Sequence, residues 1–572
     1  MTLSLHDSKD KHKEVSPVNS IKNSLQITVE FSFLDIDDCK LTIEGVAFLS
    51  ENADISDVEV FLNVNNTMVP CNIYRARLRD KARKGKLVEY AVGFAGDIID
   101  YKKFLFIEIS VCLKYKSIQK EIRSIRTGRY FPVTLSLKNA YAFRNGFIFT
   151  IKDNNIFCSK SGFIGHLKKE YLFLKELRKI NTRQSRKAII ARCIYHVAKV
   201  FQRRAIWLFS DRINKADDNG EALFKYLNEH KVHENLFFTI RKDSKDYNIV
   251  KKIGKILAYN SRKHKLIHLL ADATISSAGN QYVKNPFGDN SIYYQDILSK
   301  QKHVFLQHGI AQNNLTRWLN RFNHNFSMIV TSALPEYLSF LSWEFYYDEN
   351  VVKLTGMPRH DRLYDSRKKI VTIMPTWRNQ LVDKSKTKLY EKDGKYRYRK
   401  KEFKNTPYYI FYNSLLNDER LLQAAEENGY TIQFMPHPNI VVYIDWFEKN
   451  EKVRFCSVET RYRDIFAESA LVVTDYSSVA FDFAYLRKPV LYCQFDREEF
   501  FKSQFKHGYF DYDKDGFGEV TYNLDDTVDK IIEYMKNDCI LKEEYRNRIN
   551  NFFAFHDKNN CKRVYEAIKS LD

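Results

Sequence analysis

Two serines stand where a strand passes into a helix, a position in which a protein can bind phosphate. The apolar run 470–473 ends on Thr474 and Asp475, and after Ser477 and Ser478 apolar residues recur at helical spacing. The start of such a helix offers unpaired N–H groups and the positive end of its dipole to an anion. Serine is also a favoured N-cap residue. Taken alone, the pattern favours helix capping over phosphate binding.

Two histidines follow strand-like runs in a similar way. His308 comes directly after the run 303–307 and precedes Gly309, and His437 stands between two prolines after the run 431–435. Histidine is the side chain best suited to accept a proton near pH 7, and glycine leaves space for an incoming group. A single histidine at a strand end is more often without a catalytic role. Two of them, together with a serine pair, indicate one shared site.

Strands alternate with helices from residue 205 onward, which predicts parallel sheets covered by helices. Strands are expected at 206–211, 236–240, 273–277, 303–307, 327–332 and 351–356, and again at 370–377, 431–438, 471–478 and 489–494. A helix is expected at about 249–260. Ligands contact such sheets at the carboxyl ends of their strands, where the serines and histidines stand. We predict an α/β fold with two Rossmann-like domains, residues 205–365 and 366–572, facing across a cleft.

The first 200 residues differ in character. Residues 1–22 are polar and charged and are expected to form a disordered lead-in, and the short apolar runs of 23–155 predict a small all-β domain. Between residues 166 and 204, twelve Lys or Arg side chains stand against two Glu, in a chain whose net charge is +21. Apolar residues recur there every three or four positions, so 160–204 is predicted to form basic amphipathic helices.

These basic helices have three interpretations: a solvated face, a contact with nucleic acid, or a contact with an anionic membrane surface. The chain offers no recognisable nucleic-acid module, so no nucleic-acid partner is expected, and 160–204 is predicted to associate with a membrane. The sequence has no apolar run near 18 residues, no export signal at its start, and nine cysteines without a paired motif. These features favour the cytosol or the cytosolic face of a membrane.

Ordered blocks of the sequence resemble the CDP-glycerol glycerophosphotransferase family, the teichoic acid and capsule polyol-phosphate transferases and polymerases of bacterial envelopes. They include VFLQHGI (304–310), TGMPRHDRL (355–363), IMPTWRN (373–379), FMPHPN (434–439), VTDYSSVAFDFAYLRKPVLYCQFD (473–496) and GYFDYDKDGFG (508–518), and the resemblance runs through most of 205–567. It implies a GT-B type fold preceded by an all-β accessory domain. It also implies an acceptor side in the first Rossmann-like domain, a CDP-donor side in the second, and a C-terminal helix that packs back on the first.

The resemblance implies an enzyme that transfers glycerol phosphate or ribitol phosphate from CDP-glycerol or CDP-ribitol to a hydroxyl of a lipid-linked polyol-phosphate acceptor. It would act as a polymerase, as a peripheral protein at the cytoplasmic face of the bacterial cell membrane. The choice of polyol, acceptor and pathway stays open, and an oligomer is compatible with the sequence. The alternatives are a GT-B glycosyltransferase that uses a nucleotide sugar and a non-catalytic envelope scaffold, because a fold does not fix its donor.

The family blocks also imply roles for single residues. His308 is expected to act as the general base, with Gly309 admitting the acceptor. His437 is expected to contact the donor phosphate or the leaving CMP, as a cation or a proton donor. Ser477 and Ser478 are expected to hold the donor diphosphate.

Charged residues near these blocks are expected to assist. Arg378 is expected to supply charge to the donor phosphates, and Arg359 to supply charge near the domain junction or to anchor a turn by pairing with Asp361. Asp475 is expected to contact the donor or to order its own turn. Asp482 is expected to contact the ribose or to support the loop.

No metal site is assigned. The run Asp511, Asp513, Asp515 begins like a calcium loop, but Tyr522 occupies the twelfth position, where a bidentate Glu is required. No cofactor is therefore expected to be required, and a supporting Mg²⁺ near the donor is left open.

Overall fold

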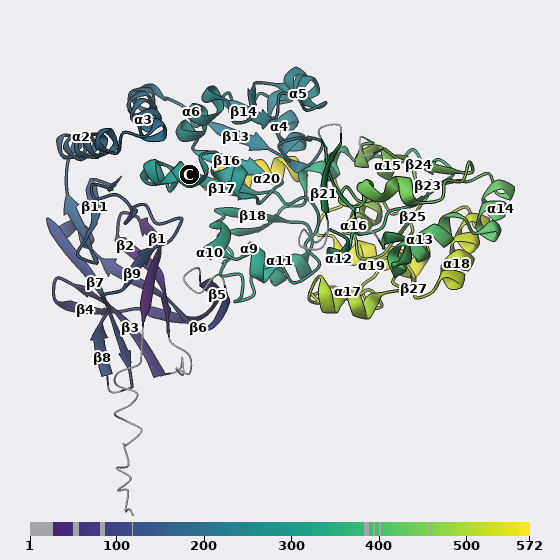
Figure 1. The fold of residues 1–572 in the computed structure, drawn as a ribbon, viewed down its shortest axis with the longest axis horizontal. Coiled ribbons are helices and arrows are strands. Elements are labelled where there is room, and N and C mark those ends of the chain that lie inside the picture. The colour runs from purple at the N-terminus through teal and green to yellow at the C-terminus, as the bar shows by residue number, and fades with distance from the viewer. Residues whose placement is uncertain are drawn as a thin grey trace, which may run out of the picture. The chain divides into compact units, whose positions relative to one another are not determined.

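The computed structural model describes residues 27–49, 57–80, 86–116, 118–382, 388–392, 395–399, 402–457 and 460–571. The expected lead-in, 1–22, lies outside the described residues. The chain forms two compact units (Figure 1). The first is Met1–Val197 with Phe287–Lys300, and the second is Ala198–Pro286 with Gln301–Asp572.

The first unit contains two sheets in which antiparallel neighbours predominate. In order across the sheet, one consists of β5 (Asn72–Asp80), β6 (Lys86–Ile99), β2 (Lys40–Phe48), β1 (Thr28–Ile36) and β9 (Ile125–Thr127). The other consists of β10 (Ala142–Arg144), β11 (Phe147–Lys152), β12 (Asn155–Lys160), β7 (Phe106–Tyr115), β3 (Val58–Val64) and β4 (Thr67–Pro70), with β8 (Ile118–Glu121) paired to β7. A short η2 helix (Tyr101–Lys103) precedes β7. Burial alternates along β3, as expected for a strand with one face on a core.

A helical pair, α2 (Phe163–Ile180) and α3 (Arg183–Phe201), packs with the inserted segment that holds η3 (Gly288–Tyr293) and α8 (Gln295–Leu298). Arg192 of α3 is fully buried among them. Its guanidinium donates hydrogen bonds of 2.8 and 2.6 Å to Glu170 of α2, and of 2.7 and 2.9 Å to Asp296 of α8. Because an unpaired buried charge is strongly unfavourable, this cluster fixes how the helices and the insertion pack.

The second unit contains two parallel sheets with the same doubly wound strand order. The first sheet has the order β15 (Ile256–Ala258), β14 (Leu236–Ile240), β13 (Trp207–Ser210), β16 (Ala273–Ser276), β17 (Lys302–Phe305), β18 (Met328–Thr331) and β19 (Val352–Leu354). The second has the order β24 (Val453–Phe455), β23 (Thr431–Phe434), β20 (Ile370–Ile373), β25 (Leu471–Thr474), β26 (Val490–Cys493) and β27 (Val520–Thr521). The predicted α/β fold with parallel sheets is confirmed.

Helices cover both sheets. In the first half they are α4 (Asn219–Glu229), α5 (Tyr247–Ile253), α6 (Arg262–Leu270), α7 (Gln281–Lys284), α9 (Thr316–Leu319), α10 (Arg321–His324), α11 (Leu334–Phe340) and η4 (Pro358–Arg362). In the second half they are α12 (Asn379–Val382), η5 (Phe403–Asn405), α13 (Pro407–Leu416), α14 (Glu419–Glu427), η6 (Val441–Trp446), α15 (Tyr462–Glu468), α16 (Val479–Tyr485), α17 (Arg497–Ser503), α18 (Leu524–Lys536) and α19 (Glu543–Phe552). A separate hairpin joins β21 (Lys388–Lys392) to β22 (Lys395–Arg399). None of the described helices has the length and apolar composition needed to cross a bilayer.

One sequence prediction in this unit is wrong. The helix expected at about 249–260 ends at Ile253, and β15 follows as the edge strand beside β14. Gly254 forms the C-cap of α5 in an extended conformation, and glycine is a poor helix residue. The apolar residues after it therefore belong to a strand.

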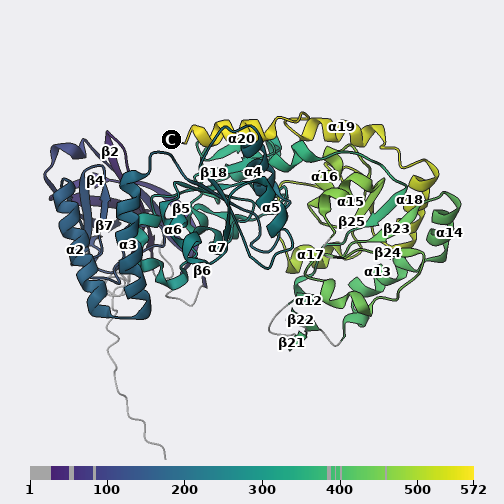
Figure 2. The same ribbon diagram turned by 90° about the horizontal axis from the view of Figure 1, so that it is seen from above.

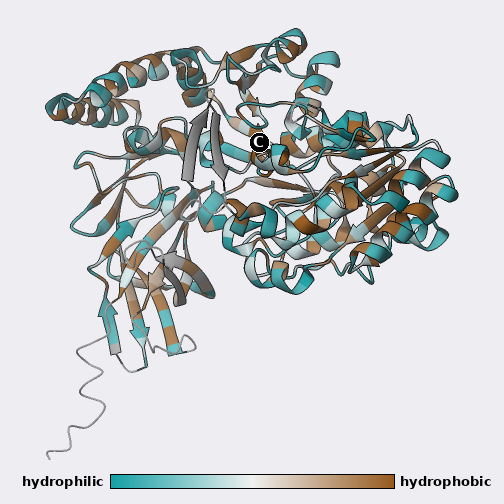
Figure 3. Ribbon diagram, turned by 45° about the vertical axis from the view of Figure 1, so that its right-hand side comes forward, coloured by the Kyte–Doolittle hydropathy of each residue, from teal (hydrophilic) through white to brown (hydrophobic). Residues whose placement is uncertain are grey.

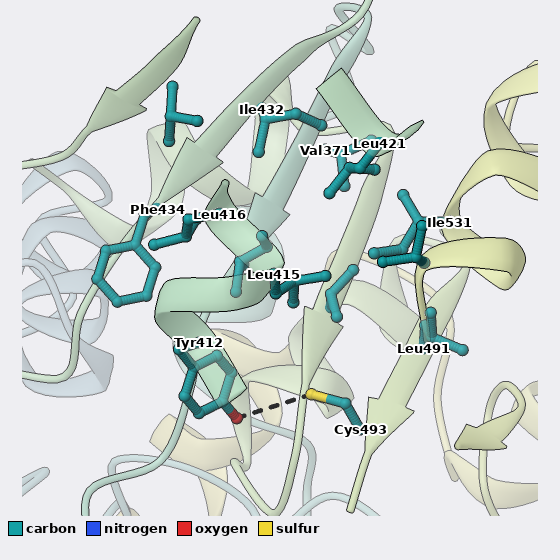
Figure 4. Close-up of a cluster of buried hydrophobic side chains, with 14 of the residues drawn as sticks. Val371, Tyr412, Leu415, Leu416, Leu421, Ile432, Phe434, Leu491, Cys493 and Ile531 are labelled. Carbon is teal, nitrogen blue, oxygen red and sulfur yellow. Dashed lines mark hydrogen bonds between the residues drawn. The ribbon is translucent and has the colours of Figure 1, made fainter. Parts of the chain in front are cut away.

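Apolar side chains from strands and helices fill the core of each half. In the second half, Val371, Ile432 and Leu491 of the sheet pack against α13 and α18, among fully buried residues. Figure 4 shows this cluster, with the hydroxyl of Tyr412 lying 3.6 Å from the Sγ of Cys493. Figure 3 shows that the strands of the parallel sheets are predominantly hydrophobic. Strands buried on both faces read as continuous apolar runs.

The last helix, α20 (Asn560–Lys569), returns to the first half and lies beside α4 (Figure 2). Its Val564 and Ile568 join the first-half core around Leu223. Asp361 of η4 fixes its start, because the carboxylate accepts hydrogen bonds from the backbone N–H and side chain of Asn560 and from the N–H of Cys561, at 2.7 to 3.0 Å. The chain therefore crosses between the halves twice.

Candidate functional site

The two halves of the second unit line one cleft with a volume of about 350 Å³. His308 reaches it from the loop after β17, His437 from the loop after β23, and Ser477 and Ser478 from the turn between β25 and α16. Gly309, Arg359 and Asp482 line it as well. The structure thus brings both predicted histidines and both serines to one cavity at the carboxyl ends of parallel strands.

A left-handed residue turns His308 into the cleft. Gln307 has φ of 61°, a conformation that is unfavourable for a residue with a side chain. Its side-chain N–H groups are bound by the carbonyl of Val330 at 2.6 Å and by Glu336 at 2.9 Å, and its carbonyl accepts a hydrogen bond of 2.8 Å from Asn219. These bonds hold the strained turn and thereby position the backbone of His308.

The space beside Gly309 is filled by the other half of the unit. A Cβ added to Gly309 would lie 2.5 Å from the Oγ of Ser478, which is closer than van der Waals contact allows. The missing side chain of Gly309 therefore accommodates Ser478, and its expected role of admitting the acceptor stays a prediction. Ser478 is the N-cap residue of α16 and makes no side-chain capping hydrogen bond, and the Oγ of Ser477 lies 3.5 Å from the N–H of Val479.

Arg359 joins the two halves at the edge of the cleft. Its guanidinium donates two hydrogen bonds to Asp482 of α16, at 2.9 and 2.7 Å, and one of 2.9 Å to Asp218 before α4. It also donates a hydrogen bond of 2.8 Å to the backbone carbonyl of His308. The predicted partner Asp361 instead holds α20, so Arg359 acts over a long sequence distance and not as a local turn anchor.

Arg378 and Asp475 form a second buried cluster behind the serine turn. The Arg378 guanidinium lies 2.8 Å from Asp475 and binds Asp496 through hydrogen bonds of 2.7 and 3.0 Å. Asp475 also accepts hydrogen bonds from the backbone N–H groups of Thr376 and Tyr476, at 2.8 and 2.7 Å. Arg378 is buried between these carboxylates and the rings of Tyr476 and Phe500. Its guanidinium therefore contacts protein groups, whereas the sequence predicted a contact with the donor phosphates. Asp475 orders its turn, the second of its two expected roles.

Asp482 is almost fully buried, and both of its carboxylate oxygens are bound by Arg359. His360 lies 3.5 Å from the same carboxylate. Of the two roles expected for Asp482, these contacts favour support of the loop over contact with the ribose.

The environment of each histidine lowers its pKa. Desolvation and the nearby charge of Arg212 lower the pKa of His437 from 6.5 to about 4. Desolvation also lowers the pKa of His308, although its side chain is exposed to the cleft. The charge of Asp218 raises this pKa, and the charges of Arg212 and Arg359 lower it. The lowered pKa values favour the neutral form of both rings near pH 7. This suits His308 as a base, whereas a cationic His437 requires a bound anion to raise its pKa.

The neutral tautomer of His437 can donate a hydrogen bond into the cleft. Its Nδ1 accepts a hydrogen bond of 3.2 Å from the backbone N–H of Asn439, which assigns the ring proton to Nε2. The expected contact of His437 with the donor phosphate or the leaving CMP stays a prediction.

Sequence reasoning missed several residues that shape the cleft. Asp211 accepts hydrogen bonds from the N–H groups of Asp218, Gly220 and Glu221 at the start of α4, and burial raises its pKa to about 8. Glu336 accepts hydrogen bonds from the N–H groups of Ala311 and Ser332 beneath the His308 loop, and burial raises its pKa to about 7. The strand-end Asp of 206–211 was visible as a signal, but Glu336 stands inside an ordinary helical pattern.

The acidic loop is held by contacts within the protein. Asp511 accepts hydrogen bonds from the N–H groups of Asp513 and Lys514, Asp515 accepts one from the N–H of Asp511, and Asp513 pairs with Arg497 at 2.7 Å. In the part of the chain that the structure describes, no three His, Cys, Asp or Glu side chains are grouped to hold a metal ion.

Comparison with known proteins decides the family. A model of the family described as CDP-Glycerol:Poly(glycerophosphate) glycerophosphotransferase matches residues 191–570. The chain belongs to this family. The resemblance noted in the sequence blocks is confirmed, and His308, His437, Ser477 and Ser478 all lie within the matched range.

Two curated proteins are similar to this chain in sequence, and one solved structure is similar to it in fold. The chain is 37% identical over 557 residues to the Minor teichoic acid biosynthesis protein GgaB of Bacillus subtilis (strain 168), which covers 95% of this chain and 60% of GgaB. It is 23% identical over 378 residues to the Teichoic acid glycerol-phosphate transferase of Staphylococcus aureus (strain NCTC 8325 / PS 47), covering 60% of this chain and 88% of the transferase. A variant of the Wall Teichoic Acid Polymerase TagF has the same fold, with a TM-score of 0.51 at 16% identity over 72% of this chain and 98% of TagF. The chain therefore spans about 60% of the length of GgaB.

We expect the two histidines of this glycerophosphotransferase-family cleft to titrate below the ordinary histidine value of 6.5, with His437 near 4. Protonation would place a positive charge in a partly desolvated site that already faces Arg212, so the neutral ring is favoured. The measurement is an NMR titration of ¹³C-labelled histidine in the unliganded protein, with signals assigned from His308→Gln and His437→Gln. A pKa at or above 6.5 for either ring would contradict this description of the cleft.

Proposed function

We propose that this chain transfers glycerol phosphate or ribitol phosphate from a CDP-linked donor to a hydroxyl of a membrane-linked teichoic acid or capsule-type acceptor, adding units successively. One observation supports this most strongly: His308 of one half and Ser477 and Ser478 of the other face a single cleft. The family and its relatives add the donor class. In this proposal the first half binds the acceptor and the second half binds the CDP donor.

The chemistry proposed for the cleft uses residues already placed there. His308 takes the proton of the acceptor hydroxyl as its oxygen attacks the polyol-bearing phosphorus. The new O–P bond forms while the bridging P–O bond breaks, and CMP leaves with its electron pair. Nε2–H of His437 donates a hydrogen bond to the leaving phosphate, and Ser477 and Ser478 hold the diphosphate. The proposal assigns no resident cofactor and leaves a supporting Mg²⁺ near the donor open.

We expect the purified protein to turn over CDP-glycerol or CDP-ribitol in a radiolabelled transfer assay, with UDP-sugars as the competing panel. His308→Ala should lower kcat by about 10²- to 10⁴-fold, the usual contribution of a general base. His230→Ala is the matched control, because His230 is an exposed histidine at the end of α4 in the same half.

Three outcomes would contradict the proposal. Turnover of a UDP-sugar alone would make the chain a sugar transferase, and absence of any turnover would favour a scaffold. A His308→Ala variant that keeps full turnover would remove the base assignment.

We also propose that α2 and α3 bind the protein peripherally to the anionic cytoplasmic face of the membrane, beside an accessory all-β domain. Each helix buries one face and leaves a second apolar stripe exposed. On α3 the stripe holds Ile190, Ile194 and Val197, which are 62%, 44% and 63% exposed. On α2 it includes Phe163 and Leu167, at 67% and 49%. Lysines and arginines flank both stripes, which is the pattern of helices that lie on anionic lipid.

We expect the protein to bind vesicles of anionic lipid in a salt-dependent manner. Replacing Ile190 and Ile194 by Ser should weaken partitioning by roughly tenfold or more, since apolar burial in the membrane is lost. Ile249→Ser is the control, because Ile249 is also exposed but lies on α5. Equal partitioning of the double variant and the control, in a vesicle co-sedimentation assay, would count against this surface.

A further inference from the structure

Five basic side chains line the cleft, and three of them are paired with carboxylates. Arg359 binds Asp218 and Asp482, Arg362 binds Glu221, and Arg463 lies 3.5 Å from Asp217. The remaining two are Arg212 and Lys215. Within the described parts of the chain, neither has a carboxylate at ion-pair distance. The cleft therefore holds two positive charges that form no close ion pair with its own acids, although Asp217 and Asp246 act on Lys215 from farther away.

Both charges stand on one tight turn directly after β13. The N–H of Lys215 donates a hydrogen bond of 3.2 Å to the carbonyl of Arg212, which brings the two residues together. The turn is fixed from outside, because the N–H of Arg241 binds the carbonyl of Ile213 at 2.7 Å and the hydroxyl of Ser244 binds the next carbonyl at 2.9 Å. The pair is thus presented by rigid backbone and not by a free loop.

The turn lies within electrostatic reach of both histidines. The charge of Arg212 lowers the pKa of His308 and of His437, which stand on different halves. The Lys215 ammonium lies 5.2 Å from the ring centre of Tyr462 on the second half. Burial lowers the pKa of Lys215. Two cations beside two neutral rings repel each other in a partly desolvated cleft. An anion bound between them would remove that repulsion.

We propose that the turn 212–215 is a phosphate subsite on the first-half wall, in which Arg212 and Lys215 bind phosphate oxygens of a substrate. Arginine offers two parallel N–H donors to a phosphate, and lysine adds a compact charge. The subsite is separate from the serine turn, which lies on the second half. The source of the phosphate rests on the proposed function: it is either the donor diphosphate or a phosphodiester of the growing acceptor.

The test compares Arg212→Gln, Lys215→Gln and the double variant with Lys225→Gln. Lys225 carries the same charge on the surface of α4, where it pairs with Glu229. Binding is measured calorimetrically at low salt with two probes, CDP and a short synthetic poly(glycerol phosphate). The double variant should lose about tenfold or more in affinity for at least one probe, since charge-assisted hydrogen bonds are lost, and the control should not. Circular dichroism and thermal unfolding establish that each variant is folded.

The two probes distinguish the sources. Weaker binding of CDP assigns the subsite to the donor, weaker binding of the polymer assigns it to the acceptor, and weaker binding of both also supports it. Unchanged affinity for both probes in a folded double variant would overturn the proposal. Neither binding measurement needs turnover, so the two proposals can fail separately. If the double variant loses CDP binding but the unaltered protein transfers no polyol phosphate, the subsite is supported and the proposed function is not.

A second readout separates this role from a purely structural one. Arg212→Gln should raise the pKa of both His308 and His437 in the unliganded protein, because a shared positive charge is removed while Asp218, Arg359 and Asp475 stay in place. Arg212→Lys keeps the charge and should restore most of the lowering. If an NMR titration of Arg212→Gln finds the pKa of both histidines unchanged, the placement of this charge between them is contradicted.

Discussion

A guanidinium shared between two halves of the second unit positions the loop of His308 against the helix that follows Ser477 and Ser478. Arg359 lies on η4 of the first half, yet two of its hydrogen bonds go to Asp482 of the second half. Asp482 is almost fully buried, and its carboxylate is paired with the Arg359 guanidinium. Removing one member of such a buried pair is unfavourable by about 3–5 kcal/mol. The pair therefore favours the arrangement in which Ser478 lies against Gly309.

The same side chain also holds the loop that carries His308. Arg359 donates to the carbonyl of His308, and its own backbone N–H binds Asn219. Asn219 in turn donates to the carbonyl of the left-handed Gln307. The start of α4, the histidine loop and the serine helix are thus connected through one charge and its hydrogen bonds. A displacement of any one of them would be transmitted to the others.

The sequence predicts the parts of this site that depend on local pattern. Strands buried on both faces appear as apolar runs, so the strand ends that carry His308, His437 and the serines can be found from the sequence. Partners across the fold cannot. The nearest carboxylate to Arg359 in sequence is Asp361, but the one in space is Asp482, because the chain returns to that point only after a full α/β domain. Arg378 was likewise predicted to contact the donor phosphates, but its guanidinium binds the buried carboxylates of Asp475 and Asp496.

Two other differences have the same cause. Gly309 reads as open space because a sequence shows a missing side chain and not the neighbour that fills its place. The strand after Gly254 reads as helix because its apolar residues continue the helical spacing, and only pairing with β14 decides otherwise. Glu336, beneath the histidine loop, has no local signal since its importance comes from burial under a strained turn.

A double-mutant cycle on Arg359 and Asp482 tests most directly whether this pair holds the His308 loop against α16. The variants are Arg359→Gln, Asp482→Asn and their combination, with kcat/KM measured for the CDP donor of the proposed reaction. Coupled residues show interaction energies of about 0.5–3 kcal/mol, so the double variant should lose little more activity than the worse single variant. Losses that simply multiply would show that the two residues act independently and would contradict the claim.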